Sequence, residues 1–570
     1  MTEISRRQML ALMGSTGAVA LGCSDDPTPA PADAAAVDAS DAGPGDAGPK
    51  DVGPTDLGAP EDAGVDAGRD VFTGDADGRA GVFLHGVASG DPLTTAVILW
   101  TRVTLAAGAT APVEVTWELS TTVDFMAVAA MGTFTTNADR DWTVKVDATG
   151  LTAGTTYYYR FRAMGMTSPI GRTRTAPEGM AARARFAVMS CSSMAHGYFH
   201  AYRNVAARLD LDAVIHLGDY IYEYGNGEYG EVRVYDPPHE IVSLSDYRRR
   251  YAHYRRDADL RAAHQQHPFV CIWDDHEFTN NAYADGADNH MPMTEGEWRA
   301  RKMAAMQAYR EWMPLRDQMD GRIFRRLPYG DLLDLVMLDT RVWARPEQAG
   351  SGPDASAVIN DPMRTLLGND QEMWLQEQLT TTRARWKIVG QQVMMGQLPL
   401  IVNDDQWDGH TAARGRFFSL LRTMMVNDVV VLTGDIHTSW AIDLTEAPND
   451  AARYDPTTGR GSLAVEFVVP GISSPGFPPN LANLASAVMR MAPHMKFVDL
   501  TRRGYGVLDV TPTRCQAAFY HLADVTDPDN RTETFAGAFS TVPGRNHLER
   551  DSMAAAAPMS PPAAAPAEPS

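Results

Sequence analysis

The sequence predicts an α/β protein that is preceded by a small antiparallel β-sandwich. Up to Pro177, short β-rich runs are separated by Gly, Asn, Asp and Pro turns, which is typical of antiparallel strands. After Pro177, near-continuous apolar runs alternate with amphipathic helical stretches, which indicates strands covered on both faces. A chain of 570 residues is long enough for about two to four domains, so each part can have its own core.

Net charge and cysteine content exclude two classes of protein. The formal net charge is −22, and residues 24–80 alone carry 14 acids against three basic residues. This balance does not suggest the clustered basic face that binds nucleic acid as a polyanion, so we expect no nucleic-acid partner of that kind. Four Cys in the whole chain cannot form a disulfide scaffold. The fold must therefore depend on its core.

Residues 1–23 resemble an export signal. The paired Arg6 and Arg7, followed by a weakly apolar run over residues 11–22, predict export by the twin-arginine route. This run is too short to span a bilayer as a helix. It ends in Ala20-Leu21-Gly22-Cys23, which resembles a lipoprotein box and predicts a lipid anchor on Cys23 as the one attachment to a membrane. Without lipidation the chain would be cut to a soluble form, so we expect a periplasmic, cell-envelope or secreted protein.

Two segments are predicted to be disordered. Residues 24–79 repeat Asp-Ala-Gly and Gly-Pro, and such a segment cannot bury enough apolar area to offset the entropy of ordering it. It is interpreted as an acidic tether. The Ala- and Pro-rich residues 551–570 receive the same interpretation. Ordered structure is expected in a β-sandwich over residues 80–177 and a second domain over residues 178–550.

The sandwich domain is predicted from four β-rich runs and one turn. The runs cover residues 97–103, 113–119, 142–146 and 157–162. Leu151–Tyr157 resembles the corner before a late strand of fibronectin type III sandwiches, in which a Tyr packs back on the turn. The domain contains no convincing cluster of metal ligands, so we expect it to have a structural or positioning role.

Four apolar runs of the second domain each end in a potential ligand. The runs are Phe186–Cys191, Ala213–Asp219, Phe269–Asp275 and Val429–Asp435. Ligands of open α/β sheets gather at the carboxyl ends of strands, so the four ends could converge on one site. Carboxylate, phenolate and imidazole groups would then be available for hard or borderline cations. The residues that offer them are Asp219, Tyr222, Asp275, Asp435 and His437.

Seven short strings follow one another in the order and approximate spacing of PhoD-like alkaline phosphatases. They are Ser190–Ser193, Gly218–Tyr224, Tyr247–Tyr254, Trp273–Asn281, Leu338–Arg341, Gly390–Val393 and Gly434–His437. Phe83–Pro92 also resembles the start of that family's N-terminal sandwich. The resemblance implies a calcineurin-like metallophosphoesterase, whose fold is a two-sheet α/β/β/α sandwich. It also implies iron and calcium as cofactors and phosphomonoesters and phosphodiesters as substrates.

The resemblance assigns metal ligands residue by residue. Cys191 takes the place of the Asp-x-His that opens the site in calcineurin-like enzymes, and would be a thiolate ligand to iron. Asp219 matches the bridging aspartate, and Tyr222 matches the tyrosinate of purple acid phosphatases. Asp275 would bind the second metal. Gly434-Asp435-Ile436-His437 stands where relatives have Gly-His-x-His, so Asp435 and His437 complete the set with a carboxylate that favours calcium.

Three further residues are expected to act on the substrate. His276 would lie beside the leaving group and donate a proton or a hydrogen bond to the departing oxygen. Asn281 could bind a metal or phosphate through its amide, and Arg248 could bind phosphate bidentately. The alternative for Arg248 is a place on an ordinary helix face, because the stretch around it is rich in Tyr and Arg.

These assignments predict a monomeric, exported phosphoesterase. Two metal ions would lower the pKa of a bound water, and the resulting hydroxide would attack phosphorus in line, releasing phosphate for scavenging. One alternative is a phosphodiesterase acting on lipid headgroups or polymers of the teichoic-acid type. A second, from a different class, is a non-catalytic envelope lipoprotein that binds a polymer or partner.

Overall fold

The computed structural model describes residues 81–568 apart from 107, 351–352 and 400–401. The predicted export signal, Cys23 and the acidic tether lie outside the described residues. None of the described helices is both long and apolar enough to cross a membrane.

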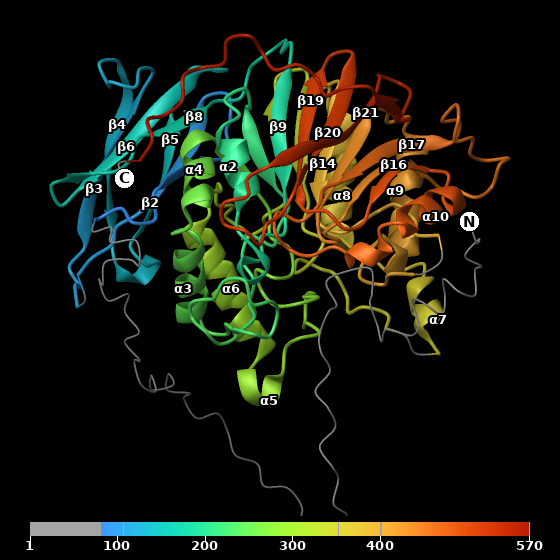
Figure 1. The fold of residues 1–570 in the computed structure, drawn as a ribbon, viewed down its shortest axis with the longest axis horizontal. Coiled ribbons are helices and arrows are strands. Elements are labelled where there is room, and N and C mark those ends of the chain that lie inside the picture. The colour runs from blue at the N-terminus through green and yellow to red at the C-terminus, as the bar shows by residue number, and fades with distance from the viewer. Residues whose placement is uncertain (1–80, 107, 351–352, 400–401, 569–570) are drawn as a thin grey trace, which may run out of the picture.

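The largest sheet has ten strands and joins both predicted domains (Figure 1). In spatial order its strands are β22 (Glu549–Asp551), β21 (Glu533–Thr541), β20 (Arg514–Leu522), β19 (Gly504–Thr511), β9 (Ala184–Met189), β10 (Ala213–His216), β11 (Pro268–Cys271), β1 (Val87–Gly90), β2 (Ala96–Arg102) and β5 (Thr143–Thr149). Strands β9, β10, β11 and β1 run parallel to one another. All four strands are fully buried, and the mostly apolar sequences of β9, β10 and β11 are those expected of strands covered on both faces.

A second sheet of seven strands faces the first. Its strands are, in order, β12 (Arg325–Tyr329), β13 (Leu333–Met337), β14 (Trp386–Gln391), β15 (Val429–Thr433), β17 (Ser462–Val468), β16 (Ser439–Thr445) and β18 (Met495–Asp499). Alternate residues of β15 belong to different cores: Val430 and Leu432 pack with residues of the ten-stranded sheet, whereas Val429 and Val431 pack with α-helices outside. This period of two places one core between the sheets.

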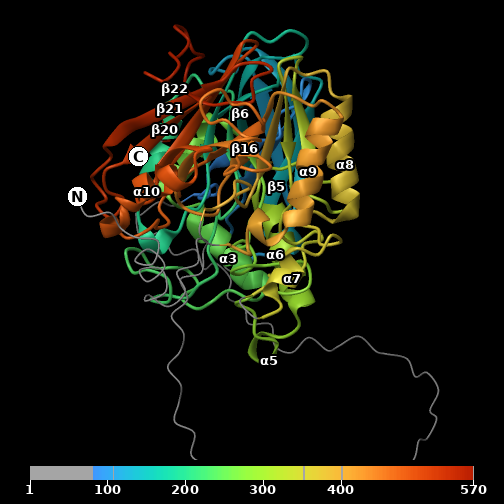
Figure 2. The ribbon, with the colours of Figure 1, turned by 90° about the vertical axis from the view of Figure 1, so that its right-hand side faces the viewer.

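Helices cover the two sheets on the outside. The described helices are α2 (His200–Ala206), α3 (Leu244–Tyr254), α4 (Ala258–Gln266), α5 (Pro292–Glu295), α6 (Trp298–Trp312), α7 (Ala355–Ile359), α8 (Gly368–Thr381), α9 (Thr411–Thr423) and α10 (Leu484–Met491). Side chains of α8, α9 and α10 pack on the outer face of the seven-stranded sheet; α8 and α9 form the right-hand edge of Figure 2. Side chains of α2, α3, α4 and α6 join the core of the ten-stranded sheet. The predicted α/β/β/α layering is therefore present.

The N-terminal sandwich is not a separate body. Its outer sheet contains β4 (Val128–Thr136), β3 (Val113–Ser120), β6 (Thr156–Ala163), β7 (Met166–Thr167) and β8 (Gly171–Arg174). The face that packs against it consists of β1, β2 and β5. These three strands belong to the ten-stranded sheet, because β1 pairs in parallel with β11. The predicted boundary at residue 177 therefore does not divide the sheets. Tyr157 does turn back on its corner, where its Oη accepts the Thr152 amide at 2.9 Å, but this bond alone does not confirm a fibronectin type III domain.

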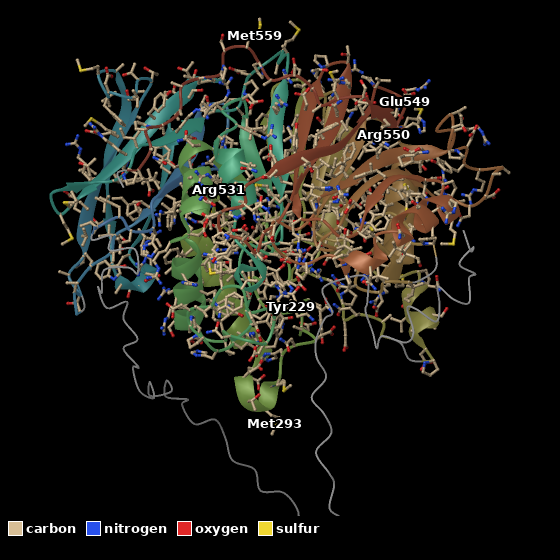
Figure 3. The ribbon with its side chains drawn as sticks, viewed as in Figure 1. Tyr229, Met293, Arg531, Glu549, Arg550 and Met559 are labelled. Carbon is tan, nitrogen blue, oxygen red and sulfur yellow. The ribbon has the colours of Figure 1, made fainter. Side chains whose placement is uncertain are left out.

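The C-terminal segment, expected to be disordered, is ordered through residue 568. It crosses the top of the molecule to the sandwich, as the red trace of Figure 1 and Met559 in Figure 3 show. The Tyr158 hydroxyl donates to the Ala563 carbonyl at 2.8 Å, and Gln266 exchanges two hydrogen bonds with the Ala565 backbone. Arg261 pairs with Glu568 at 3.2 Å. Composition suggested disorder, but side chains of β6 and α4 satisfy this backbone.

Candidate active site

The predicted ligands converge where strands of both sheets end. Cys191, Asp219 and Asp275 follow the adjacent parallel strands β9, β10 and β11, and Asp435 follows β15 of the opposite sheet. Cys191, Asp219, Asp435 and His437 all have positive φ angles, between 55° and 63°. Such conformations are uncommon for non-glycine residues and concentrate at functional sites. The sharp turns aim successive side chains into the space between the sheet ends.

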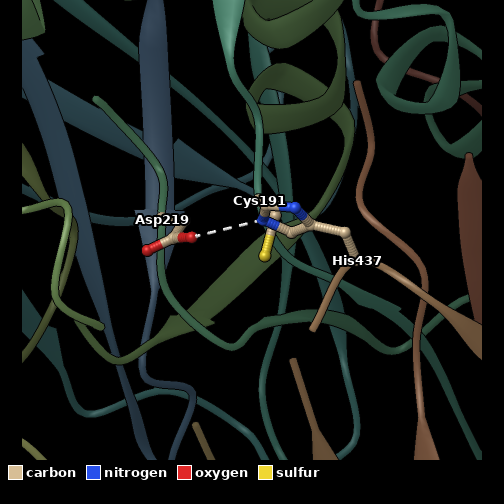
Figure 4. Close-up of side chains that lie close together, drawn as sticks. All are labelled: Cys191, Asp219 and His437. Carbon is tan, nitrogen blue, oxygen red and sulfur yellow. Dashed lines mark ion pairs between the residues drawn. The ribbon is translucent and has the colours of Figure 1, made fainter. Parts of the chain in front are cut away.

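Cys191, Asp219 and His437 form the first group of potential ligands (Figure 4). One ligand atom from each lies within 4.8 Å of the others, and all three residues are buried. The Tyr222 hydroxyl joins them: it donates to Asp219 Oδ2 at 2.9 Å and lies 3.2 Å from His437 Nε2. His437 Nδ1 lies 2.9 Å from the Pro475 carbonyl, to which it can donate, so that Nε2 faces the group. Burial raises the pKa of the Cys191 thiol well above its usual range, so a thiolate here needs a cation.

Two further groups follow: the second shares Asp219 with the first, and the third shares Asp275 with the second. Asp219, Asp275 and His276 form the second, and Asp274, Asp275 and Asp435 form the third. Asp219 therefore belongs to two groups, as expected of a bridging ligand, and so does Asp275. Asp274 was part of a recognised string, but no role was predicted for it.

Buried atoms without partners show that these groups fit metal ions. Asp219 Oδ1, Asp274 Oδ2 and Asp275 Oδ1 are inaccessible and have no hydrogen-bond partner among the described residues. An unpaired buried carboxylate oxygen is costly, and coordination of a cation is one of the few ways to compensate it. The first group offers sulfur, nitrogen and oxygen, which suits a transition metal. The third offers only carboxylate oxygens, which suits a hard cation.

Arg341 is a charged residue at the centre of the acids whose role was not predicted. Its side chain is fully buried and donates to Asp274, to Asp405 at 2.8 Å and 2.9 Å, and to Asp435 at 2.8 Å. Burial raises the pKa of Asp435 to about 7 against the opposing effect of Arg341. Burial acts in the same direction on Asp275, but there Arg341 and His276 hold the pKa below its usual value. Arg341 thus keeps part of the acid cluster ionised.

His276 is held by Glu223, which sequence reasoning also missed. His276 Nδ1 lies 2.7 Å from Glu223 Oε2, and both side chains are fully buried. Glu223 Oε1 accepts the Asn280 amide at 2.7 Å, so the carboxylate is itself fixed. The imidazole stacks on Tyr222 with ring centroids 4.2 Å apart. Burial opposes protonation, but Glu223, Asp275 and Asp219 raise the pKa of His276 well above its usual value. The protonated form of His276 is therefore favoured, and its Nε2 is buried beside the ligand groups without a hydrogen-bond partner among the described residues.

A third missed residue, Glu277, fixes the loops that carry the ligands. Its carboxylate accepts backbone amides from Asp219 at 3.0 Å, Tyr220 at 2.7 Å and Asp274 at 2.7 Å. It therefore joins the turn after β10 to the turn after β11. Glu277 lies beside His276 in the string Trp273–Asn281, which could have drawn attention to it, but its contacts could not be predicted from the spacing of residues.

The structure places the two predicted phosphate contacts differently. The backbone N–H of Asn281 donates to Asp275 Oδ2 at 2.6 Å, and the side-chain Nδ2 of Asn281 donates to Asp288 Oδ2 at 2.8 Å. Asn281 is thus at the site and orients Asp275. Arg248 pairs with both carboxylate oxygens of Glu311 at 2.7 Å and donates to the Asp139 carbonyl at 2.6 Å. The proposed phosphate contact of Arg248 is wrong, because its donors tie α3 to α6 and to the sandwich.

The two-sheet architecture is a fold that a phosphatase of known structure shares. A purple acid phosphatase, PPD1 from yellow lupin (Lupinus luteus) seeds, has the same overall arrangement, with a TM-score of 0.53. The likeness covers 81% of this chain and 74% of that chain at 12% sequence identity, and so concerns the fold alone.

The chain belongs to the PhoD-like phosphatase family. The family's sequence model matches residues 186–519, and the model of its N-terminal domain matches residues 70–177. Alkaline phosphatase D of Bacillus subtilis (strain 168) is 38% identical over 479 residues, which is 80% of each protein. A solved structure of PhoD matches with a TM-score of 0.75 and 35% identity, covering 83% of this chain and 92% of that chain. The family suggested by the seven strings is confirmed.

Proposed function

We propose that the protein is an exported, metal-dependent phosphoesterase that hydrolyses phosphomonoesters, phosphodiesters or both at alkaline pH. The observation that carries the proposal is the set of three buried ligand groups, of which the first and second share Asp219 and the second and third share Asp275. Family membership supports phosphate esters as the substrates. Release of phosphate outside the inner membrane, by a monomer with a lipid on Cys23, is the biological role that we propose for it.

The side chains divide into metal-binding and proton-handling groups. Cys191, Asp219, Tyr222 and His437 would hold one metal, for which we propose iron; the acids around Asp275 and Asp435 would hold calcium. When bound, the metals would supply the positive charge that receives the phosphoryl oxygens and would activate a water. Their charge would also offset the acidity of the site.

His276 and its supports would act on the leaving group. Glu223 holds the imidazole so that Nε2 faces the ligand groups. From there His276 can donate a proton to the oxygen of the departing alcohol. Glu277 and Asn281 fix the backbone and the carboxylates around it, so the donor does not have to reorganise when the ester bond breaks.

Turnover of chromogenic esters tests the proposal. The purified, metal-replete protein should release p-nitrophenol from p-nitrophenyl phosphate or from bis(p-nitrophenyl) phosphate. Activity should be lost on chelation, return with metal, and fall at least about 100-fold in Asp219→Asn, since the bridging carboxylate is lost. A matched control is Asp139→Asn, which changes an acid outside the site. A folded, metal-replete protein that cleaves neither ester would refute the proposal.

A further inference from the structure

Arg503 is a half-buried arginine next to the site that has no assigned role. It immediately precedes β19, and the following Gly504 amide donates to the Gly471 carbonyl at 3.0 Å. Ser474, three residues beyond Gly471, bonds the Cys191 carbonyl through its amide at 3.3 Å and the Tyr222 hydroxyl through its Oγ at 2.6 Å. Arg503 is therefore attached to the loop that supports the first ligand group.

The guanidinium of Arg503 lacks the ion pairs that hold the other arginines of the site. In the described part of the chain it makes no ion pair within 4.0 Å and no hydrogen bond, and its Nε is inaccessible and unpartnered. The groups whose charges act on it are Tyr229 and then Asp524, which is half-buried and already accepts the amide and the hydroxyl of Thr526 at 2.7 Å and 2.8 Å. A cation partly removed from water without a bound anion is available for an anionic ligand.

His196 and Tyr229 connect Arg503 to the leaving-group side of the site. The 3-10 turn that ends at His196 follows directly after Cys191–Ser193, and Tyr198 beyond it donates its amide to the Val525 carbonyl at 2.7 Å. The His196 ring lies 4.4 Å from that of Tyr229. Leu522, three residues before Val525, donates its amide to the Arg503 carbonyl at 2.9 Å, so the segments that carry His196 and Arg503 are joined through the same loop. Burial and the charges of His437 and Arg503 lower the pKa of His196 to about 3.

Tyr229 covers the residue that would protonate the leaving group. Its ring stacks at 5.7 Å from Tyr222 and at 6.3 Å from His276. It lies beneath the strands near the middle of the molecule (Figure 3), and 7% of its surface is exposed. The Tyr229 ring therefore lies next to the rings of Tyr222 and His276 and also next to that of His196.

We propose that Arg503, with His196 and Tyr229, forms a subsite that binds a second anionic group on the alcohol part of the substrate. The ligand chemistry is a phosphoester whose alcohol carries a carboxylate or a further phosphate. The aromatic ring of Tyr229 would contact the body of the alcohol, and the guanidinium would pair with its charge. This inference rests on the proposed phosphoesterase function.

A pair of substrates that differ in one charge tests the subsite. Phenyl phosphate and 4-carboxyphenyl phosphate share the ring and the ester and differ by the carboxylate; phosphate release is measured for both. In Arg503→Met, kcat/KM for 4-carboxyphenyl phosphate should fall about tenfold, mainly through KM, with less than a twofold change for phenyl phosphate. Arg503→Lys, which keeps the charge without the planar fork, should lie between the wild type and Arg503→Met.

Arg502→Met is the matched control, because Arg502 is the adjacent arginine but is exposed and lies 3.5 Å from Asp499. It should leave the ratio of the two substrates unchanged. The proposal is overturned if Arg503→Met leaves the ratio of kcat/KM values as in the wild type, whether both fall together or neither falls. Failure of the proposed function is a different result: the wild type would then turn over neither p-nitrophenyl ester. If only the diester is cleaved, the methyl diesters of the same pair are used.

Discussion

Replacing Glu223 by Gln should separate substrates by the quality of their leaving group. The substitution keeps the shape of the side chain and an oxygen for the Asn280 amide, but removes the charge that lies 2.7 Å from His276 Nδ1. Loss of an outer partner of this kind typically costs about 10- to 100-fold in activity, equivalent to about 1.4–2.8 kcal/mol of barrier. The loss acts through His276, because Glu223 fixes the imidazole and stabilises its protonated form.

The assay compares kcat for phenyl phosphate and p-nitrophenyl phosphate. Phenolate is the poorer leaving group and needs the proton of His276, so phenyl phosphate should lose the full 10- to 100-fold. p-Nitrophenolate departs without much help, so its rate should fall less than about threefold. Glu231→Gln, at an exposed position of the same loop, is the control. Equal losses for both substrates would refute a proton-donating His276 held by Glu223.

Three other changes test separate parts of the structure. Arg248→Met should lower the melting temperature but leave kcat/KM within about twofold, because Arg248 pairs with Glu311 rather than with substrate; a large loss of activity without destabilisation would restore a phosphate-binding role. Deleting residues 561–570 should cost about 2–4 kcal/mol in urea unfolding, since it removes several buried hydrogen bonds to Tyr158 and to α4; an unchanged midpoint would argue for a detached tail. Burial and then Arg172 lower the pKa of His267 to about 3, so its contribution is present above the ordinary pKa near 6.5 and is lost as the pH falls toward 3. His267→Gln should therefore flatten the loss of unfolding free energy between pH 7 and pH 5 by about 2 kcal/mol, and parallel pH profiles would contradict this.

The strands and the ligands that end them could be predicted because local pattern determines both. A continuous apolar run that ends in Asp219 or Asp275 indicates a buried strand and a polar carboxyl end without knowledge of the partners. The last three of the seven strings lie at or just after the carboxyl ends of strands of the opposite sheet, so their order also predicted that this sheet contributes to the site. The predicted ligands Cys191, Asp219, Asp275, Asp435 and His437 do lie in the three groups, to which the structure adds Asp274 and His276.

Residues that act through distant partners could not be predicted in this way. Glu223 meets His276 across 53 positions, and Arg341 meets Asp435 across 94. Their roles depend on the path of loops, which the hydrophobic periodicity of helices and strands does not predict. A Tyr- and Arg-rich stretch such as the one around Arg248 is more often an ordinary helix face than a phosphate site, and the pairing of Arg248 with Glu311 of α6 agrees with the helix face.

The same limit applies to the edges of the fold. Nothing local to β1 indicates that it pairs with β11, about 180 residues later, and so merges the sandwich with the ten-stranded sheet. The C-terminal segment has the composition of a disordered tail, yet its backbone is satisfied by Gln266 and Tyr158. Composition describes what a segment can bury by itself, not what the rest of the chain offers it.

The metal content of the purified protein tests the central claim most directly. Elemental analysis of the wild type should find at least two metal ions per chain, and Asp219→Asn should lose metal together with activity, because Asp219 belongs to two ligand groups. Ser120→Ala, in the sandwich, should keep both. A wild-type protein that hydrolyses phosphate esters at full rate with no stoichiometric metal would contradict the account.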